Sequence, residues 1–144
     1  MRLSVALSGS SMSQPFADIS VTNSGRRACV LTGYPRVAVV GFRAWPDKPA
    51  PSMRLRIAVH HGIYERVDPG PHRLVLQPLH DVFFSIGTAT AYQGGLHPIT
   101  MNRLSVILPR THTPKTLAIN LMATRPPGRK IPVGITALTA SPRP

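Results

Sequence analysis

Apolar and polar side chains alternate along most of this chain. Leu3, Val5 and Leu7 are each separated by one small or polar residue, and the same period of two runs from Phe16 to Thr22. A period of two places successive side chains on opposite faces of a β-strand. The pattern therefore predicts short strands, and it recurs in segments 3–7, 16–22, 29–31, 37–40, 55–59, 74–76, 82–86, 104–108, 117–121 and 133–138.

Turn-forming residues separate these segments. The chain contains 16 prolines and 11 glycines spread along its length, with dense joints at 45–49, 68–71 and 125–128. No window of a dozen residues combines helical spacing with freedom from proline and glycine, so we expect little helix. We interpret segment 37–40 as the continuation of 29–31 beyond a bend. The sequence therefore predicts an all-β fold, an immunoglobulin-like antiparallel β-sandwich of about eight or nine short strands.

Length and composition favour one domain. With 144 residues, 42% of them apolar and 15% charged, the chain can close a hydrophobic core without a metal or a disulfide. We expect a single β-sandwich domain over residues 1–140 and a flexible C-terminal tail at 141–144. No segment approaches the roughly 18 apolar residues that a membrane helix needs. The first residues also lack the apolar core of a signal peptide, so the residues alone indicate a cytoplasmic protein or one whose beginning has been removed.

The stretch ACVLTGYPRV contains the only cysteine of the chain and a Gly-Tyr-Pro corner, and we interpret Cys29, Gly33, Tyr34 and Pro35 as structural residues. Glycine can take the backbone angles that a bend needs, and proline biases the preceding residue toward extended backbone. We expect the ring of Tyr34 to cover one end of the sandwich, with its hydroxyl on a backbone group. A lone cysteine on an apolar strand is typically a small buried side chain.

The chain is strongly basic: it contains 17 lysines and arginines but only 5 acidic residues, which gives a formal net charge of +12. Arginine binds phosphate and carboxylate groups in a planar two-point geometry, so an anionic partner is expected. The cations are scattered, with no run of five that would indicate a nucleic-acid arm. Nucleic-acid binding stays an alternative that needs the arginines on one face. The candidates for contact with an anionic partner are Arg26, Arg27, Arg36, Arg54 and Arg56.

No motif in the chain indicates catalysis. The sequence has no phosphate-binding loop, no dinucleotide motif and no nucleophile elbow. Among six histidines, His60 and His61 are adjacent, so on a strand they point to opposite faces and do not form a metal site by themselves. We predict no enzyme, no catalytic or metal-binding residue and no cofactor. A small histidine-centred enzyme or metal-binding protein remains the alternative, and it requires three or more histidines in one cleft.

Four stretches resemble one family along nearly the whole chain: LSVALSG, ADISVTNSGRRACVLTGYPRVAVV, RLVLQPLHDVFFSIG and NRLSVILPRT. They are similar to the actinobacterial cell-envelope family called domain of unknown function 4232. The strongest match is the segment with Asn23, Gly25, Cys29 and the Gly-Tyr-Pro corner. A later family motif, Leu-x-Pro-Gly, corresponds to residues 76–79, where the proline is kept and Leu79 replaces the glycine.

The resemblance implies an immunoglobulin-like fold and an exported protein, often a lipoprotein or the outer part of a membrane protein. It also implies a disulfide between Cys29 and a cysteine whose position would lie before Met1, while a second family cysteine pair is absent. We therefore expect an extracytoplasmic or cell-envelope location, with a cytoplasmic one as the alternative. The expected function is non-enzymatic binding of another envelope protein or of an anionic wall or lipid component.

Overall fold

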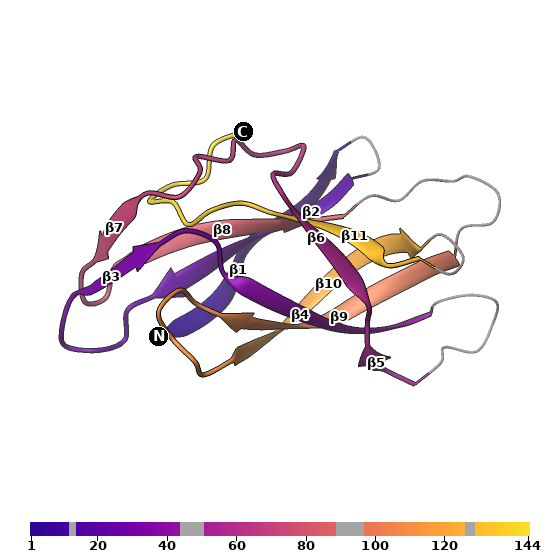
Figure 1. Cartoon of the computed structure of the whole chain (residues 1–144), viewed down its shortest axis with the longest axis horizontal. Coiled ribbons are helices and arrows are strands. Elements are labelled where there is room, and N and C mark those ends of the chain that lie inside the picture. The colour runs from indigo at the N-terminus through magenta and orange to yellow at the C-terminus, as the bar shows by residue number, and fades with distance from the viewer. Residues whose placement is uncertain (12–13, 44–50, 89–96, 126–128) are drawn as a thin grey trace.

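The computed structural model describes residues 1–11, 14–43, 51–88, 97–125 and 129–144. Every regular element in these ranges is a β-strand (Figure 1). The strands are β1 (Arg2–Ser11), β2 (Gln14–Thr22), β3 (Cys29–Thr32), β4 (Arg36–Arg43), β5 (Met53–Arg54), β6 (Ile57–His61), β7 (Arg73–Leu76), β8 (Asp81–Gly87), β9 (His97–Ile107), β10 (Lys115–Arg125) and β11 (Ile131–Ile135).

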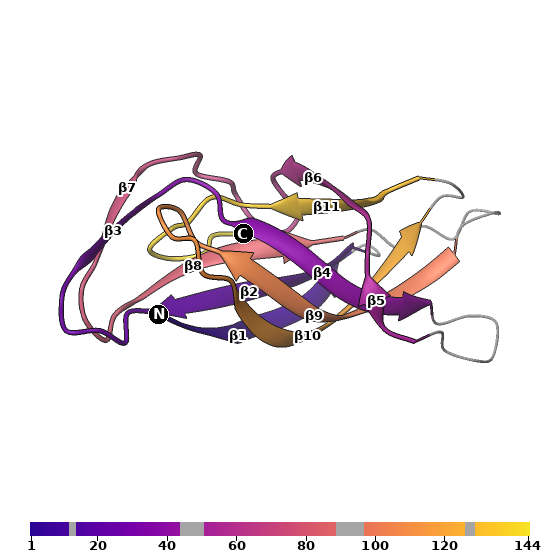
Figure 2. The same cartoon turned by 60° about the horizontal axis from the view of Figure 1, so that its bottom comes forward.

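Two sheets form the layers of the sandwich. One has five strands in the order β1-β2-β8-β11-β6, the other has four in the order β10-β9-β4-β5, and β3 pairs with β7 in a separate ribbon. Figure 2 shows the β3–β7 ribbon extending from one end of the two sheets. The all-β sandwich predicted from the period-two pattern is confirmed.

The structure differs from the prediction in strand number and in one pairing direction. Eleven strands are described instead of eight or nine, partly because segments 29–31 and 37–40 form separate strands and because the short β5 precedes segment 55–59. The buried Leu55 donates its backbone N–H to the carbonyl of Val39 at 2.9 Å while the chain crosses between the two sheets. After this crossing β6 runs parallel to β11, so the sandwich is not antiparallel throughout.

The core lies between the inner faces of the two sheets. Alternate residues of each long strand point inward, as Ile19 and Val21 of β2 and Leu104 and Val106 of β9 show. Each side chain of this kind contributes about 1.5–3 kcal/mol when it is fully buried. The largest fully buried side chains are Phe84, Ile19, Leu76, Ile86, Met101, Leu104, Ile131, Ile135, Leu138, Val21, Val39 and Val106.

The Gly-Tyr-Pro corner joins β3 of the ribbon to β4 of the four-stranded sheet. Gly33 has a φ of +98°, a left-handed angle that L side chains rarely adopt, and its carbonyl accepts the N–H of Leu138 at 3.0 Å. Pro35 is buried directly after the bend. The predicted continuation of 29–31 into 37–40 therefore crosses from one sheet to another instead of remaining in one strand.

A side-chain turn at Asn23 closes the connection between β2 and β3, and a backbone contact holds the C-terminal segment. The buried amide of Asn23 accepts the N–H of Gly25 at 3.0 Å and donates to the carbonyls of Arg27 and Leu76. In the residues 141–144, expected as a tail, the carbonyl of Arg143 accepts the N–H of Val67 at 2.8 Å. The joint expected at 45–49 and residues 126–128 of the last joint lie outside the described residues.

Candidate functional site

Three of the five candidate arginines lie around one groove between the four-stranded sheet and β6 of the five-stranded sheet. Arg54 and Arg56 line a hollow of about 520 Å³ together with Lys130, and Arg36 and Arg54 line an adjoining hollow of about 200 Å³. The two hollows share Val37, Ala38 and Arg54 as walls, so they are continuous. We call the surface formed by Arg36, Arg54, Arg56 and Lys130 the basic groove.

Strand register explains why Arg36 and Arg54 lie on the same face of the four-stranded sheet. In the four-stranded sheet Val40 of β4 lies opposite Arg54 of β5 on one side and Arg103 of β9 on the other. Directly opposite residues of antiparallel strands share a face, and Arg36 is on that face because it precedes Val40 by an even number of residues. Val39, one residue away, is fully buried against the core. The sheet thus presents Arg36, Arg54 and Arg103 outward.

The carboxylates that the structure describes lie elsewhere. Asp18 and Asp81 belong to strands of the five-stranded sheet, and Glu65 and Asp68 belong to the connection between β6 and β7. Among the described residues only one salt bridge forms, between Arg66 and Asp18 at 2.8 Å. The cations of the basic groove therefore have no ion-pair partner in the described part of the chain.

Arg26 and Arg27 are not part of this groove. They are exposed residues of the connection between β2 and β3. Figure 1 places β3 and β5 toward opposite ends of the molecule, and Figure 2 agrees. Two further cations were not predicted from the sequence: Lys130, which belongs to the basic groove, and Arg103, which lies on the same outer sheet face as Arg36 and Arg54. Arg103 could have been found from the period of two in β9, whereas Lys130 comes close to Arg56 only through the parallel pairing of β6 and β11.

The Gly-Tyr-Pro corner builds a second polar cluster. The hydroxyl of Tyr34 donates to Oδ2 of Asp68 at 2.5 Å, so its partner is a side-chain carboxylate and not the backbone group that we expected. The ring of Tyr34 stacks on His61, with centroids 3.5 Å apart and planes inclined by 6°. Oδ1 of Asp68 accepts the N–H groups of Gly70 at 3.1 Å and Ala137 at 3.0 Å.

These contacts determine the ionisation of the cluster. The hydrogen bond to Asp68, with smaller contributions from burial and from the negative charge of Asp68, raises the pKa of Tyr34 to about 12. For Asp68, burial alone would raise the pKa. The hydrogen bonds from Tyr34, Ala137 and Gly70 outweigh burial and hold that pKa below its usual value. A protonated phenol on an ionised carboxylate is therefore the stable state over a wide pH range.

Cys29 is half-buried on β3 and is a free thiol, so it is less enclosed than the buried side chain that we expected. Its sulfur lies 3.8 Å from the carbonyl of Arg27, and its strand partner is Leu76 of β7. Within the described residues no group of three or more histidine, cysteine or acidic side chains is arranged to hold a metal ion. The side chain of His97 lies outside the described part.

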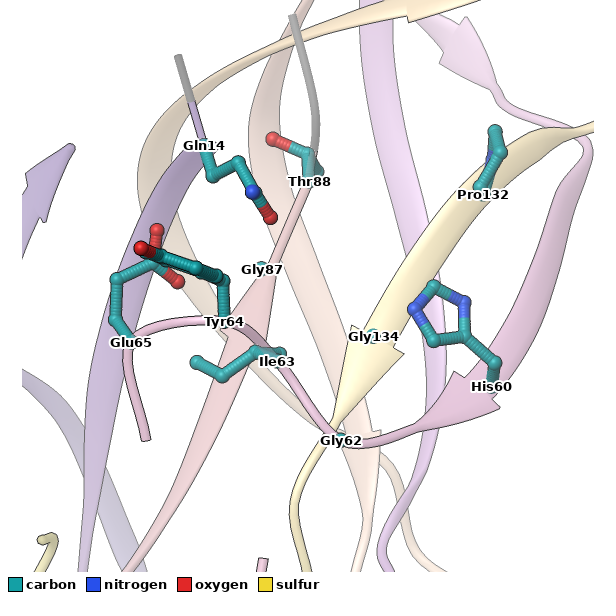
Figure 3. Close-up of a pocket in the computed structure, with 10 residues that line it drawn as sticks. All are labelled: Gln14, His60, Gly62, Ile63, Tyr64, Glu65, Gly87, Thr88, Pro132 and Gly134. Carbon is teal, nitrogen blue, oxygen red and sulfur yellow. The ribbon is translucent and has the colours of Figure 1, made fainter. Parts of the chain in front are cut away.

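A smaller cavity of about 240 Å³ lies where the connection after β6 crosses β8 and β11 (Figure 3). The lining includes the side chains of Gln14, His60, Tyr64 and Glu65, and we call it the Glu65 cavity. Burial raises the pKa of Glu65, although its own backbone N–H and the nearby Arg66 guanidinium act in the opposite direction. No local pattern in the sequence marks this glutamate as buried.

Fold and surface together define a β-sandwich with a basic groove between its two sheets and a small cavity that contains Glu65 near the edge of the five-stranded sheet. A family model described as "Domain of unknown function (DUF4232)" matches residues 1–137, and the chain belongs to this family. No curated protein and no solved structure matches the chain. In the described residues no helix is both long and apolar enough to cross a membrane.

Proposed function

We propose that this protein is a non-enzymatic binding module of the cell envelope, and that its basic groove holds a phosphate-bearing anion of the wall or of the lipid surface. The observation that carries the proposal is the gathering of Arg36, Arg54, Arg56 and Lys130 around one groove between the four-stranded sheet and β6, away from the described carboxylates. The envelope location rests on the family resemblance, in which exported proteins are typical.

The groove suits repeated anionic groups better than stacked bases. A guanidinium group holds a phosphate through two parallel hydrogen bonds, and three arginines with a lysine offer several such contacts along one surface. The walls between the cations are the aliphatic side chains of Val37, Leu55, Ile57 and Val59, together with Ala38. Binding of single-stranded nucleic acid relies on aromatic platforms for the bases, and none of the described lining residues of the groove is aromatic.

The test is binding to vesicles that contain an anionic phospholipid, compared with vesicles of neutral phospholipid, at low and high salt. The variant Arg36→Gln/Arg54→Gln/Arg56→Gln removes three charges from the groove. Because each cation near an anionic surface contributes about 1 kcal/mol, we expect roughly a hundredfold weaker binding. Wild-type binding should fall steeply as salt is added, since screening shortens the range of these contacts.

The matched control is Arg2→Gln/Arg73→Gln/Arg110→Gln, which removes the same net charge from exposed positions on β1, on β7 and in the β9–β10 turn. It should retain most of the binding. Equal losses in both triple variants would show that total charge and not the groove binds the surface. Binding that does not change with salt would contradict the proposal directly. An acidic protein segment becomes the better partner if a polyglutamate peptide binds more tightly than the vesicles.

A further inference from the structure

Glu65 is the one described acidic side chain that is buried without a partner. Only 9% of its surface is exposed, and apart from its own backbone N–H neither Oε1 nor Oε2 has a hydrogen-bond partner among the described residues. A buried carboxylate normally accepts hydrogen bonds or pairs with a cation, because an unsatisfied one carries a large desolvation cost. This chain has 17 lysines and arginines that could have supplied such a partner.

The connection that carries Glu65 is firmly anchored. Gly62, with a φ of +99°, donates its N–H to the carbonyl of Ile135 at 2.8 Å, and Ile63 and Arg66 form an isolated β-bridge. Arg66 then forms a two-point ion pair with the buried Asp18, through Nε at 3.1 Å and Nη2 at 2.8 Å. The position of Glu65 in the cavity wall is therefore fixed by these backbone and side-chain contacts.

Arg66, the cation next to Glu65 in sequence, binds Asp18 and not the Glu65 carboxylate. Arg66 is committed to Asp18, which also accepts the hydroxyl of Ser85 at 2.6 Å, and its guanidinium lies 4.7 Å above the ring of Phe16. Its Nη1 donates to the backbone carbonyl of Glu65, not to the carboxylate. The carboxylate of Glu65 thus remains available to a group from outside the chain.

Beside the hollow, the connection that carries Glu65 packs closely against β11 and β8. A Cβ at Gly134 would lie 2.3 Å from the carbonyl oxygen of Gly62, and one at Gly87 would lie 2.9 Å from a methyl carbon of Ile63. These two glycines let the anchored connection rest directly on β11 and β8. Figure 3 shows Tyr64 and Gln14 near the carboxylate of Glu65, Thr88 beyond Gln14, and His60 and Pro132 on the other side of the hollow.

The remaining polar groups of the cavity are compatible with a hydrogen-bond donor. The hydroxyl of Thr88 donates to the carbonyl of Met122 at 2.5 Å, so its oxygen can accept a further hydrogen bond. The amide of Gln14 carries another acceptor oxygen. Since liquid water occupies about 30 Å³ per molecule, a cavity of about 240 Å³ has room for roughly eight non-hydrogen atoms.

We propose that the Glu65 cavity binds a small organic cation with a primary ammonium group, which donates hydrogen bonds to Oε1 and Oε2 of Glu65. An ammonium group brings three donors and a positive charge, which match the two unpartnered oxygens and the nearby acceptors. A small anion would meet the carboxylate unfavourably. A divalent metal ion would need several oxygen ligands, and the cavity offers one carboxylate.

The first experiment uses the wild-type protein with n-butylammonium chloride and follows the backbone amide resonances by NMR titration. We expect saturable shifts at Gly62, Glu65, Gly87 and Gly134, which lie around the cavity. The neutral isostere n-butanol should bind at least tenfold more weakly than n-butylammonium, because it lacks the positive charge. Equal binding of n-butanol, or shifts confined to other parts of the chain, would overturn the proposal.

The second experiment compares two variants in the same titration. Glu65→Gln keeps the shape of the side chain and removes its charge, so n-butylammonium should bind at least tenfold more weakly. The control Asp81→Asn removes an exposed carboxylate on β8, hydrogen-bonded to Thr22, and should leave the affinity unchanged. If Glu65→Gln binds as tightly as the wild type, the assignment is wrong. Vesicle binding by the basic groove is measured separately, so failure of one proposal does not affect the other.

Discussion

Leu79 shows at the scale of one residue how this chain departs from the pattern it resembles. It follows Pro78 in a four-residue turn between β7 and β8, closed by the N–H of His80 on the carbonyl of Gln77 at 3.1 Å. Its φ is +63°, and its side chain is 78% exposed. Proline at the second position and a positive φ at the third are typical of a type II turn, which favours glycine at the third position.

Replacing Leu79 by glycine should therefore stabilise the protein. Glycine relieves the strain of the left-handed backbone, and this gain exceeds the free-energy cost of the greater flexibility that glycine gives the unfolded chain. We expect the free energy of unfolding to rise by about 1 kcal/mol. In a chain of this size the melting temperature should rise by about 3 °C. Calorimetry measures the shift, with Leu79→Ala as the control that keeps the strained φ. Equal stabilisation by alanine would mean that the exposed leucine side chain, not the backbone, is unfavourable.

At the scale of elements, the connections of this fold are held by side chains that are distant in sequence. Tyr34, between β3 and β4, donates to Asp68, between β6 and β7, and Asp68 in turn accepts the N–H of Ala137 after β11. His61 at the end of β6 stacks on the tyrosine ring. One cluster thus fastens the β3–β4 connection, the β6–β7 connection, the end of β6 and the segment after β11 at the same place, and its strength depends on a protonated phenol and an ionised carboxylate.

The cluster should make stability depend on pH at both extremes. The pKa of Tyr34 is raised to about 12 from an ordinary 10.0, so its contribution is complete below about pH 10 and is lost as the pH rises through 12. The pKa of Asp68 is lowered, so its contribution is complete above its ordinary value of 3.8 and is lost as the pH falls through the folded value. Tyr34→Phe should lose about 1 kcal/mol at neutral pH.

A titration of phenolate absorbance checks the cause of the raised pKa. In the wild type one tyrosine should ionise near pH 12, and this step should be missing in Tyr34→Phe. In Asp68→Asn the same tyrosine should ionise closer to its ordinary pH, because the anionic acceptor is gone. A wild-type Tyr34 that ionises at about pH 10 would show that the hydrogen bond to Asp68 does not persist in solution.

The elements themselves could be predicted from sequence, whereas their partners could not. Period-two patterning located β2 and β8 within two residues, because the apolar side chains that face the core recur at every second position. The same patterning could not show that β6 joins β11 in parallel, since pairing depends on where the chain crosses between sheets. Glu65 was missed for a related reason: its burial comes from the ion pair of Arg66 with Asp18, 48 residues away in sequence.

At the scale of the whole molecule, charge is distributed unevenly over the two layers. The four described carboxylates lie on the five-stranded sheet or on the connection after β6, while Arg36, Arg54 and Arg103 share the outer face of the other sheet. With a net charge of +12, repulsion among exposed cations opposes the compact state. A cluster of cations without acidic neighbours in the described residues therefore costs stability, and a surface kept at such a cost is consistent with an anionic partner.

This cost can be measured in the absence of any ligand. Two like charges about 10 Å apart in water repel by a few tenths of a kcal/mol, so Arg36→Gln/Arg54→Gln/Arg56→Gln should gain about 1 kcal/mol in free energy of unfolding at low salt. Added sodium chloride should stabilise the wild type and narrow the difference, since salt screens exposed charges. Urea unfolding at several salt concentrations measures both effects.

The dispersed variant Arg2→Gln/Arg73→Gln/Arg110→Gln separates local from global repulsion, because it lowers the net charge equally. Its three positions belong to β1, β7 and the β9–β10 turn, so each has fewer cationic neighbours and the gain should be smaller. If both triple variants gain the same stability, repulsion is a property of total charge and the groove carries no special cost. If the groove variant is the less stable one, its arginines have partners in solution, and the argument for an external anion loses its basis.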